Sequence, residues 1–310
     1  MNSATREAYG SALIELGKTN PNVVALDADL AGSTKSAGFG KAYPERFFDM
    51  GIAEADMIGT AAGLATCGKI PFASSFAVFC TGRAFEQIRN SVCNAGLNVK
   101  VVGSHAGPSC GEDGSSHQAV EDIALMRALP YMTVVVPADD VEAYAATLAL
   151  AEHQGPSYLR VARLASPTIH DEDYVFELEK GDLLRDPDDA QITIVACGMM
   201  VPRALEAADK LATEGIAAQV VNMHTIKPID ADLLEACARK TGKIITIEEA
   251  SIIGGLGSAV CEALAERYPV PVRRIGMPDI FGTSGNGAEL LEHFKLNAAH
   301  IIELAHELCD

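Results

Sequence analysis

One acid in the first quarter of the chain stands where it could take part in proton chemistry. Glu54 lies in the run Phe-Asp-Met-Gly-Ile-Ala-Glu-Ala-Asp-Met at residues 48–57, just before an apolar segment of small residues. Apolar residues recur at helical spacing over 55–67 and Gly68 follows them, so a helix is predicted to begin beside Glu54. A carboxyl group buried there would hold or share a proton, whereas an exposed one would only complement the helix dipole.

A second candidate site is the loop His105–His117, with the sequence His-Ala-Gly-Pro-Ser-Cys-Gly-Glu-Asp-Gly-Ser-Ser-His. It follows a predicted strand at 99–103, and ligands of open α/β sheets bind at the carboxyl ends of strands. Its two histidines, Glu112 and Asp113 offer proton donors and acceptors at close range, although a solvated turn is the alternative. Zinc is disfavoured because the histidines are not spaced i, i+4 and Cys110 does not complete a tetrahedral set with them.

A pair of aromatic residues, Phe76 and Phe79, follows another strand-like run. Two aromatic side chains three residues apart usually belong to a hydrophobic core, but they can also clamp a flat heterocycle. Both interpretations stay open on the residues alone.

The segments that must position these residues alternate between apolar runs and helical patterns. Strands are predicted at 23–26, 99–103, 133–136 and 158–161, and helices at 83–92, 121–129 and 141–152. Short buried strands between helices are typical of a mostly parallel sheet with helices on both faces. A polar stretch interrupts the pattern, which restarts at Ile192. The sequence therefore predicts an α/β protein with domains at 1–166 and 190–310, joined by a linker at 167–189.

Composition narrows the class of protein. The 310 residues are 48% apolar, which suits a sizeable core in about two domains, and no window of eighteen consecutive apolar residues predicts a membrane span. A formal net charge of -18, from 24 basic and 42 acidic residues, argues against a nucleic-acid surface, so anion binding would depend on a few specific basic residues. The eight cysteines form no CxxC pair and the N-terminus has no signal-peptide pattern, so we expect free thiols and a cytoplasmic location.

Taken in order and spacing, several segments resemble the pyrimidine-binding half of transketolases, and the second domain resembles the transketolase C-terminal domain. The resemblance covers nearly the whole chain. The first set is Asp29–Ser33, Gly51–Glu54, Ser75–Phe79, Gly111–Gly114 with His117, and Gly155–Arg163; the second is His224–Asp230, Glu248–Glu249 and Ser251–Ser258.

The resemblance leaves out one part of a complete transketolase. That part is an N-terminal domain that binds a cofactor diphosphate through Mg2+, with a Gly-Asp-Gly motif and a later Asn. Here Gly181-Asp182 has no third glycine and no suitably placed Asn, so no metal ligand is expected in this chain. The chain thus resembles the C-terminal subunit of a split transketolase, which needs an N-terminal subunit and at least a dimer of this chain, with a heterotetramer expected.

The resemblance implies thiamine diphosphate as the cofactor. Glu54 would hydrogen-bond N1′ of its aminopyrimidine and favour the imino tautomer that removes the proton from C2 of the thiazolium. Phe76 and Phe79 would form an aromatic wall, and Asp29 would also contact the cofactor. A tyrosine that often follows in the family is replaced by Gly82.

The same resemblance implies the substrate contacts. His105 and His117 would contact the reacting carbonyl and the donor sugar, and Asp113 would bind a sugar hydroxyl. The loop has Ser115-Ser116 where the family has Pro-Thr. The residues that would bind phosphate are Arg6, Ser33 and Arg163, and guanidinium groups suit phosphate because they bind two of its oxygens at once.

The function implied is transfer of a two-carbon ketol unit from a ketose phosphate to an aldose, in pentose phosphate metabolism. One alternative is the beta subunit of the first component of a 2-oxoacid dehydrogenase, which shares the two-domain plan and the glutamate. A specialised transketolase-like enzyme for an unusual sugar is another. A fragment of a 1-deoxyxylulose-phosphate synthase is disfavoured because that enzyme is ordinarily one chain, and a non-catalytic subunit is disfavoured because Glu54 and His117 are both present.

Overall fold

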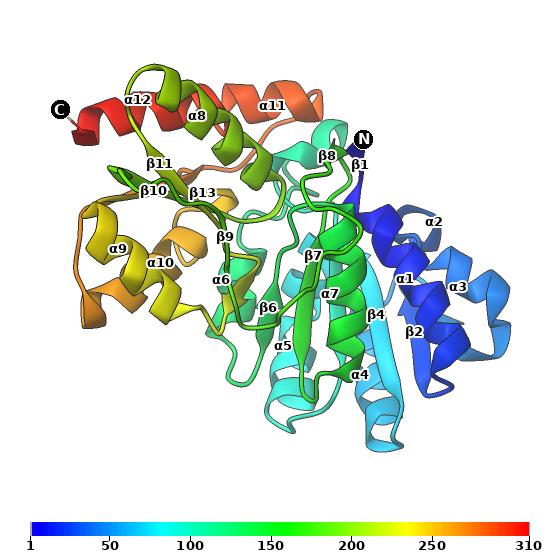
Figure 1. The fold of residues 1–310 in the computed structure, drawn as a ribbon. Coiled ribbons are helices and arrows are strands. Elements are labelled where there is room, and N and C mark those ends of the chain that lie inside the picture. The colour runs from blue at the N-terminus through cyan, green and yellow to red at the C-terminus, as the bar shows by residue number, and fades with distance from the viewer. Residues whose placement is uncertain (1, 310) are drawn as a thin grey trace.

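A seven-stranded sheet organises the first half of the protein in the computed structural model, which describes residues 2–309 (Figure 1). The strand order is β12-β6-β7-β5-β4-β2-β3, and all neighbours are parallel except β12 and β6. Strands such as β2 are buried along their whole length because helices cover both faces of the sheet. The strands are β2 (Val23–Asp27), β3 (Phe47–Asp49), β4 (Ile70–Phe76), β5 (Lys100–Ser104), β6 (Thr133–Val135), β7 (Ser157–Val161) and β12 (Thr225–Lys227).

Helices cover both faces of this sheet, and each face has its own hydrophobic core. On one face lie α1 (Thr5–Thr19), α3 (Ala37–Ala42) and α7 (Asp140–Glu152), around Tyr9, Leu13 and Phe39. On the other lie α4 (Glu54–Thr66), α5 (Phe85–Gln87) and α6 (Asp122–Ala128). The short helix α2 (Ala31–Thr34) follows β2, and a two-stranded pair joins β1 (Asn2–Ser3) to β8 (Ser166–Pro167).

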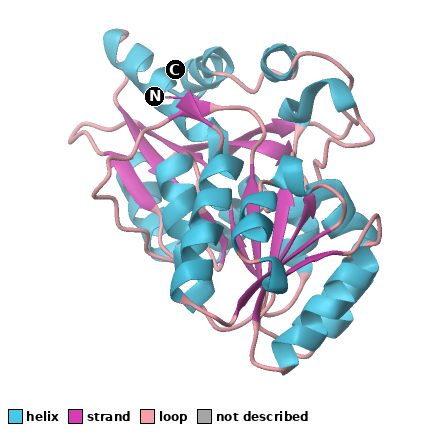
Figure 2. Ribbon diagram, turned by 90° about the vertical axis from the view of Figure 1, so that its right-hand side faces the viewer, coloured by secondary structure: helices cyan, strands magenta, loops and turns pink. Residues whose placement is uncertain are grey.

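The second half contains a five-stranded sheet with the order β14-β13-β10-β11-β9. Figure 2 shows strands of the molecule with helices packed against them. Its strands are β9 (Asp182–Arg185), β10 (Ile192–Ala196), β11 (Ala218–Asn222), β13 (Ile244–Ser251) and β14 (Val272–Met277). On one face pack α8 (Val201–Thr213), α11 (Gly287–His293) and α12 (Ala298–Cys309), and on the other α9 (Ala231–Thr241) and α10 (Leu256–Arg267). The core beneath α9 and α10 is continuous with the core beneath α4 and α6, so the two halves share apolar contacts.

The predicted α/β class, with two mostly parallel sheets and helices on both faces, is confirmed. Each sheet also has one antiparallel edge strand, and one of these two strands, β12, pairs across the two halves. β9 lies inside the predicted linker 167–189 and pairs with β11, while β12 comes from the second half and pairs with β6. The domain boundaries themselves stay a prediction.

The segment after β4 differs from its prediction. Instead of one helix at 83–92, two π-helical turns at Val78–Arg83 and Ile88–Cys93 flank α5. The chain turns helical directly after the strand, where the Thr81 hydroxyl donates to the Ala77 carbonyl at 2.7 Å. As a result Phe79 lies on the first helical turn, one turn beyond Phe76.

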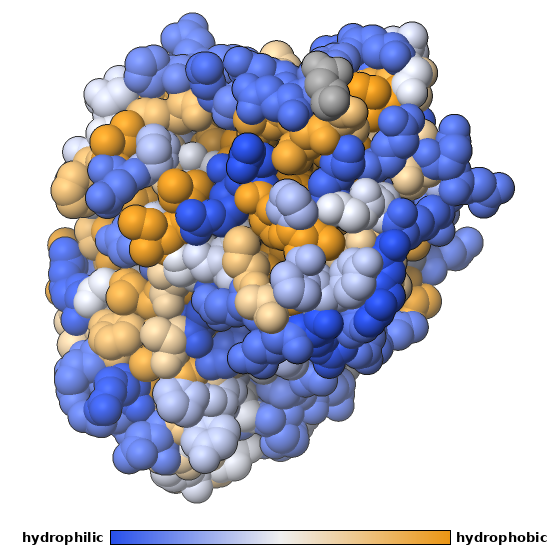
Figure 3. Space-filling model, turned by 90° about the vertical axis from the view of Figure 1, so that its left-hand side faces the viewer, coloured by the Kyte–Doolittle hydropathy of each residue, from blue (hydrophilic) through white to orange (hydrophobic). Residues whose placement is uncertain are grey.

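The surface of the second half mixes polar and apolar residues. Figure 3 shows small orange patches separated by blue ones over the face that is on the left of Figure 1. Among the described residues, no helix is both long and apolar enough to cross a membrane.

Candidate active site

The start of α4 places Glu54 in the interior. Gly51, with φ +65°, turns the chain before the helix, and the Glu54 side chain is only 1% exposed. Its surroundings are not wholly apolar, because Arg83 Nη1 donates to both carboxylate oxygens at 2.9 and 2.7 Å. The Arg83 guanidinium therefore places a positive charge directly beside the buried carboxylate. The sequence did not identify Arg83 as a site residue. The small number of basic residues could have drawn attention to it, because an arginine near a predicted pocket is then less common.

An aromatic cluster adjoins this pair. The rings of Phe76 and Phe79 are nearly parallel, with centroids 6.0 Å apart and an interplanar angle of 10°. The ring of His105 stacks on Phe76 at 4.0 Å, and His117 meets Phe79 edge-on at 5.2 Å. The Arg83 guanidinium lies 4.7 Å from the centroid of the Phe79 ring. The contacts therefore form a continuous chain: Glu54 pairs with Arg83, Arg83 lies over Phe79, and the two phenylalanine rings contact both histidines.

The hydrogen bonds of His105 determine its tautomer. This residue follows β5 with φ +59°, and its side chain is buried. Its Nε2 lies 2.9 Å from Arg6 Nη1, and because a guanidinium can only donate, Nε2 must accept. Its Nδ1 therefore carries the proton and donates to Ser104 Oγ at 2.5 Å. Burial, aided by the nearby cations, lowers the pKa of His105 to about 3, so the ring is neutral at neutral pH.

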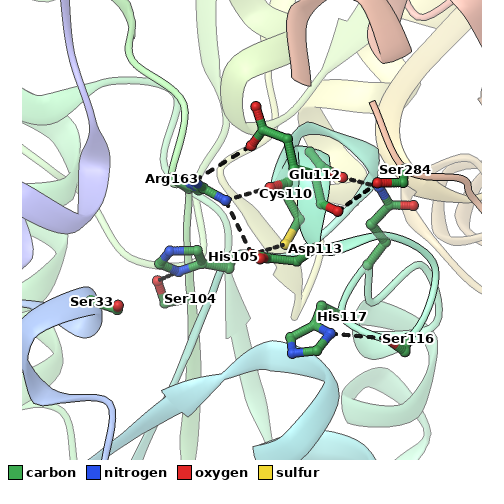
Figure 4. A network of polar contacts seen from close by, with 12 residues as sticks. Ser33, Ser104, His105, Cys110, Glu112, Asp113, Ser116, His117, Arg163 and Ser284 are labelled. Atoms are coloured by element: carbon green, nitrogen blue, oxygen red, sulfur yellow. Dashed lines mark hydrogen bonds and ion pairs between the residues drawn. The ribbon is translucent and has the colours of Figure 1, made fainter. Parts of the chain in front are cut away.

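Two arginines from different elements lie near the histidine, and Figure 4 shows one of them, Arg163, with its contacts to the loop. Arg6, on α1, also donates to the Ser33 carbonyl on α2 at 3.1 Å, and burial lowers its pKa. Arg163, just after β7, donates to the Cys110 carbonyl at 2.8 Å and to Asp113 Oδ2 at 3.1 Å. We call Arg6, Ser33, His105 and Arg163 the anion end of the site, and Glu54, Phe76, Phe79 and Arg83 the cofactor end.

The loop between the two histidines is held by the second half of the chain. Ser109 N–H donates to Glu249 Oε1 at 2.6 Å, and the Ser284 hydroxyl donates to the Glu112 carbonyl at 2.6 Å. Burial raises the pKa of Glu249 to about 6. Gly107 has φ +72°, and a Cβ there would lie only 2.5 Å from Glu249 Oε1, so this position requires glycine. Nothing in the sequence of the loop predicted that Glu249 and Ser284 would contact it.

One predicted residue stands apart from these contacts. Asp29 has φ +62° and is exposed, and its N–H donates to Asp49 Oδ1 at 3.1 Å. The buried acid at the end of β2 is instead Asp27, whose pKa is raised by burial. Asp27 accepts hydrogen bonds from Leu30 N and from the Thr34 and Ser36 hydroxyls at 2.7, 2.6 and 2.8 Å, which fixes the turn that carries Ser33.

Two protein-family models match the sequence of this chain. The model of the transketolase pyrimidine-binding domain matches residues 2–168, and that of the transketolase C-terminal domain matches 180–301. The chain belongs to the transketolase family. The resemblance inferred from the sequence is thereby confirmed.

Three transketolase relatives match almost end to end. A protein from Methanocaldococcus jannaschii, described as a transketolase C-terminal section, is 49% identical over 96% of this chain and 93% of its own length. A 6-deoxy-6-sulfo-D-fructose transketolase subunit from a Clostridium species is 45% identical over 98% of this chain and 94% of its own. A solved structure described as a split-gene transketolase in an inactive β4 tetramer is 53% identical, with a TM-score of 0.92, and the match covers 99% of this chain and 98% of that one.

This transketolase chain offers three kinds of chemistry at neighbouring positions. The guanidinium groups of Arg6 and Arg163 can bind an anion, and Nε2 of neutral His105 can accept a hydrogen bond from a donor group. Glu54 offers buried carboxylate oxygens that can accept a hydrogen bond.

Proposed function

We propose that this chain is the C-terminal subunit of a split transketolase that moves a two-carbon ketol unit from a ketose with an anionic end to an aldose. The observation that carries the proposal is the contact set around His105, which stacks on Phe76 and accepts from Arg6. That set joins the anion end to the cofactor end, so one ligand can touch both. A ketose phosphate is the donor we infer for a pocket bordered by two guanidinium groups.

Thiamine diphosphate is the cofactor we propose, and the residues at the cofactor end fit its aminopyrimidine. A flat heterocycle can stack beside Phe79 and hydrogen-bond to buried Glu54. Arg83 now contacts both of these side chains and would have to move, and it is able to because its side chain is 51% exposed. The bound cofactor would supply the electron sink for cleavage of the ketose.

The remaining roles follow from what each side chain can do. Glu54 would exchange a proton with the pyrimidine ring nitrogen, and Phe76 and Phe79 would stack against the ring. His105 and His117 would hydrogen-bond the oxygens of the donor, and Asp113 would accept from a sugar hydroxyl. The anionic end of the sugar would bind Arg6, Arg163 and Ser33. For Asp29, a contact with the cofactor from its exposed position after β2 remains part of the proposal.

A second subunit completes the proposed enzyme. We infer that an N-terminal transketolase subunit binds Mg2+ and the cofactor diphosphate, and that at least two copies of this chain assemble with it. The inactive state of the related β4 tetramer supports this need for a partner. All eight cysteines are free thiols, which supports a reducing, cytoplasmic location.

Alternative substrates keep the same site chemistry. The relative described as a 6-deoxy-6-sulfo-D-fructose transketolase subunit favours a ketose that ends in a sulfonate as a second candidate donor. Phosphate and sulfonate groups both present the oxygens that guanidinium groups bind. The beta subunit of a 2-oxoacid dehydrogenase would instead require decarboxylation of a 2-oxoacid.

The test mixes the purified chain with an N-terminal transketolase subunit that carries Gly-Asp-Gly and a later Asn. With thiamine diphosphate and Mg2+, we expect ketol transfer only in the mixture. Ketose phosphate, ketose sulfonate and uncharged ketose donors are compared at equal concentration, and pyruvate decarboxylation is measured beside them. Transfer by the isolated chain would remove the need for a partner, and decarboxylation without transfer would replace the proposed reaction.

A further inference from the structure

A second buried polar cluster lies where the segment between the two halves passes between α7 and the second sheet. It consists of Glu142 in the first turn of α7, His170 after β8, Asp182 at the start of β9 and His224 just before β12. We call these four residues the junction cluster. Glu142 and His224 have no exposed surface, and the side chains of His170 and Asp182 are 6% and 24% exposed. The cluster shares no residue with the proposed active site.

Two ring nitrogens point at the same carboxylate oxygen in this cluster. The Nε2 atoms of His170 and His224 each lie 3.8 Å from Asp182 Oδ2. Within residues 2–309 neither nitrogen has a hydrogen-bond partner. The opposite nitrogens are engaged, His170 Nδ1 with Asp139 Oδ2 at 3.0 Å and His224 Nδ1 with Thr225 Oγ1 at 2.9 Å. Histidines that bind metals are oriented in this way, with the second nitrogen bound to a carboxylate or another oxygen.

The basic side chains that face the carboxylates of the cluster are those of histidines. Across the described chain, neither Glu142 nor Asp182 forms an ion pair with a lysine or an arginine. The Tyr174 hydroxyl lies 2.9 Å from Glu142 Oε1 and 2.7 Å from Asp182 Oδ2, but its single proton can serve only one of them. Glu142 also accepts from Asn222 Nδ2 at 2.8 Å and from the Ala138 N–H at 2.5 Å, so hydrogen bonds and imidazole groups compensate the two buried carboxylates in the free chain. A bound divalent cation would compensate their charge more directly.

We propose that the junction cluster binds one divalent transition-metal ion, with Zn2+ as the best match. Single donor atoms from Glu142, Asp182 and His224 all lie within 4.8 Å of one another. His170 lies outside that set, but its Nε2 is 3.8 Å from Asp182 Oδ2, so a rotation of its ring would bring it in as the fourth ligand. Metal–ligand bonds of about 2.0–2.2 Å place tetrahedral donors about 3.3–3.6 Å apart, so small side-chain rotations close the site. Two imidazoles with two carboxylates suit zinc better than Mg2+ or Ca2+, which prefer oxygen ligands alone.

A metal ion at this place would have a structural role. Its ligands come from α7 in the first half, from the connecting segment and from the chain between β11 and β12. Four protein ligands leave no open position for a substrate, as in closed structural zinc sites. The ion would therefore fasten the two halves together without entering the reaction.

The experiment uses the full chain, with its tag removed and after treatment with a chelator. We expect one Zn2+ per chain by elemental analysis after dialysis, a higher Tm in Zn2+ than in chelator, and visible absorption bands of tetrahedral Co2+ when cobalt replaces zinc. No uptake of either metal above a chelator blank would overturn the proposal, because a proton between His170 and Asp182 would then be the only cation there.

Two variants assign the metal to the cluster. H224F removes the nitrogen but keeps a ring against Phe176, whose centroid lies 4.4 Å from that of His224, and D182N keeps the side-chain shape. We expect each to lose the stoichiometric metal and the shift in Tm. H300Q is the matched control, because His300 pairs with Glu303 on the surface of α12, and it should bind as the unaltered chain does. Full binding by D182N would assign the metal to surface residues and end the proposal, even if H224F failed to fold.

Discussion

At the anion end of the site, one half-buried arginine donates to both Ser33 and His105, and a second arginine donates to the loop carbonyl of Cys110. At the cofactor end, Glu54 is more deeply buried than the first arginine, but its partner Arg83 has a side chain that is 51% exposed. The polar groups of the first region are tied to backbone and to one another. In the second region, the acid is neutralised by a side chain that can swing into solvent.

This difference indicates how the two ends would respond to ligands. Groups already held in place lose little conformational entropy when an anion binds, so the anion end is organised in the free chain. At the cofactor end, a heterocycle must replace the contact of Arg83 with Glu54 before it can hydrogen-bond that acid. The cofactor and Arg83 therefore compete for Glu54, and contacts with the proposed partner subunit would favour the cofactor.

The largest effect is expected for E54Q, which tests whether the cofactor end performs proton chemistry. The amide keeps the size of the side chain but cannot take up the proton, so kcat of the assembled enzyme should fall by about 100-fold or more. Circular dichroism and Tm of the variant should stay close to those of the unaltered chain. E86Q, at an exposed acid beyond Arg83, is the control. Turnover near normal in E54Q would remove this acid from catalysis.

The next effect sharpens the role assigned to the anion end. R163Q should raise KM for an anionic ketose about 10- to 100-fold with a smaller change in kcat, because hydrogen bonds to charged groups contribute about 1.5–3 kcal/mol. An uncharged ketose donor should be affected little. R203Q, at a surface arginine paired with Glu206, is the control. An equal loss with charged and uncharged donors would mean that Arg163 acts through the loop and not on the anion.

A smaller effect concerns the neutral histidine of the anion end. The folded chain lowers the pKa of His105 to about 3, well below its unfolded value, so the unfolded state takes up the proton first as pH falls. Stability from this residue is complete above about pH 6.5 and is lost between there and pH 3, with a slope of up to about 1.4 kcal/mol per pH unit.

Urea unfolding at pH 7 and pH 5 measures this effect. The variant H105N tolerates the left-handed backbone and does not titrate in this range. Between these two pH values the unaltered chain should lose about 1–2 kcal/mol more than the variant. An equal loss in both would show that His105 is protonated in the folded chain.

The smallest effect addresses the ion pair that distinguishes the cofactor end. In a double-mutant cycle of R83M, E54Q and both together, the coupling free energy of unfolding should be about 0.5–1 kcal/mol, since an exposed partner weakens an ion pair. The same cycle in cofactor titrations should show tighter binding in R83M than in the unaltered chain when the partner subunit is present. Weaker binding in R83M would mean that Arg83 orients the acid and does not compete for it.

The sequence was most informative about local elements. Buried strands such as β2 and β7 and the helices α4 and α7 lie within one or two residues of their predicted bounds, because burial on both faces leaves a plain apolar pattern. The turns after β4 were not anticipated, since periodicity does not separate a π-helical turn from an α-helix. The strand β9 was hidden in a polar stretch because it is a short edge strand with partly exposed side chains.

By itself, the sequence determined the two α/β halves, the transketolase resemblance and the residue types available for chemistry, since these depend on local pattern and order. The tertiary structure decided which groups meet. Arg83 reaches Glu54 across 29 positions, and Ser109 reaches Glu249 across 140, and no local pattern encodes such pairs. The tautomer of His105 likewise depends on Arg6, 99 positions away, because a proton resides where the neighbouring donors and acceptors allow it.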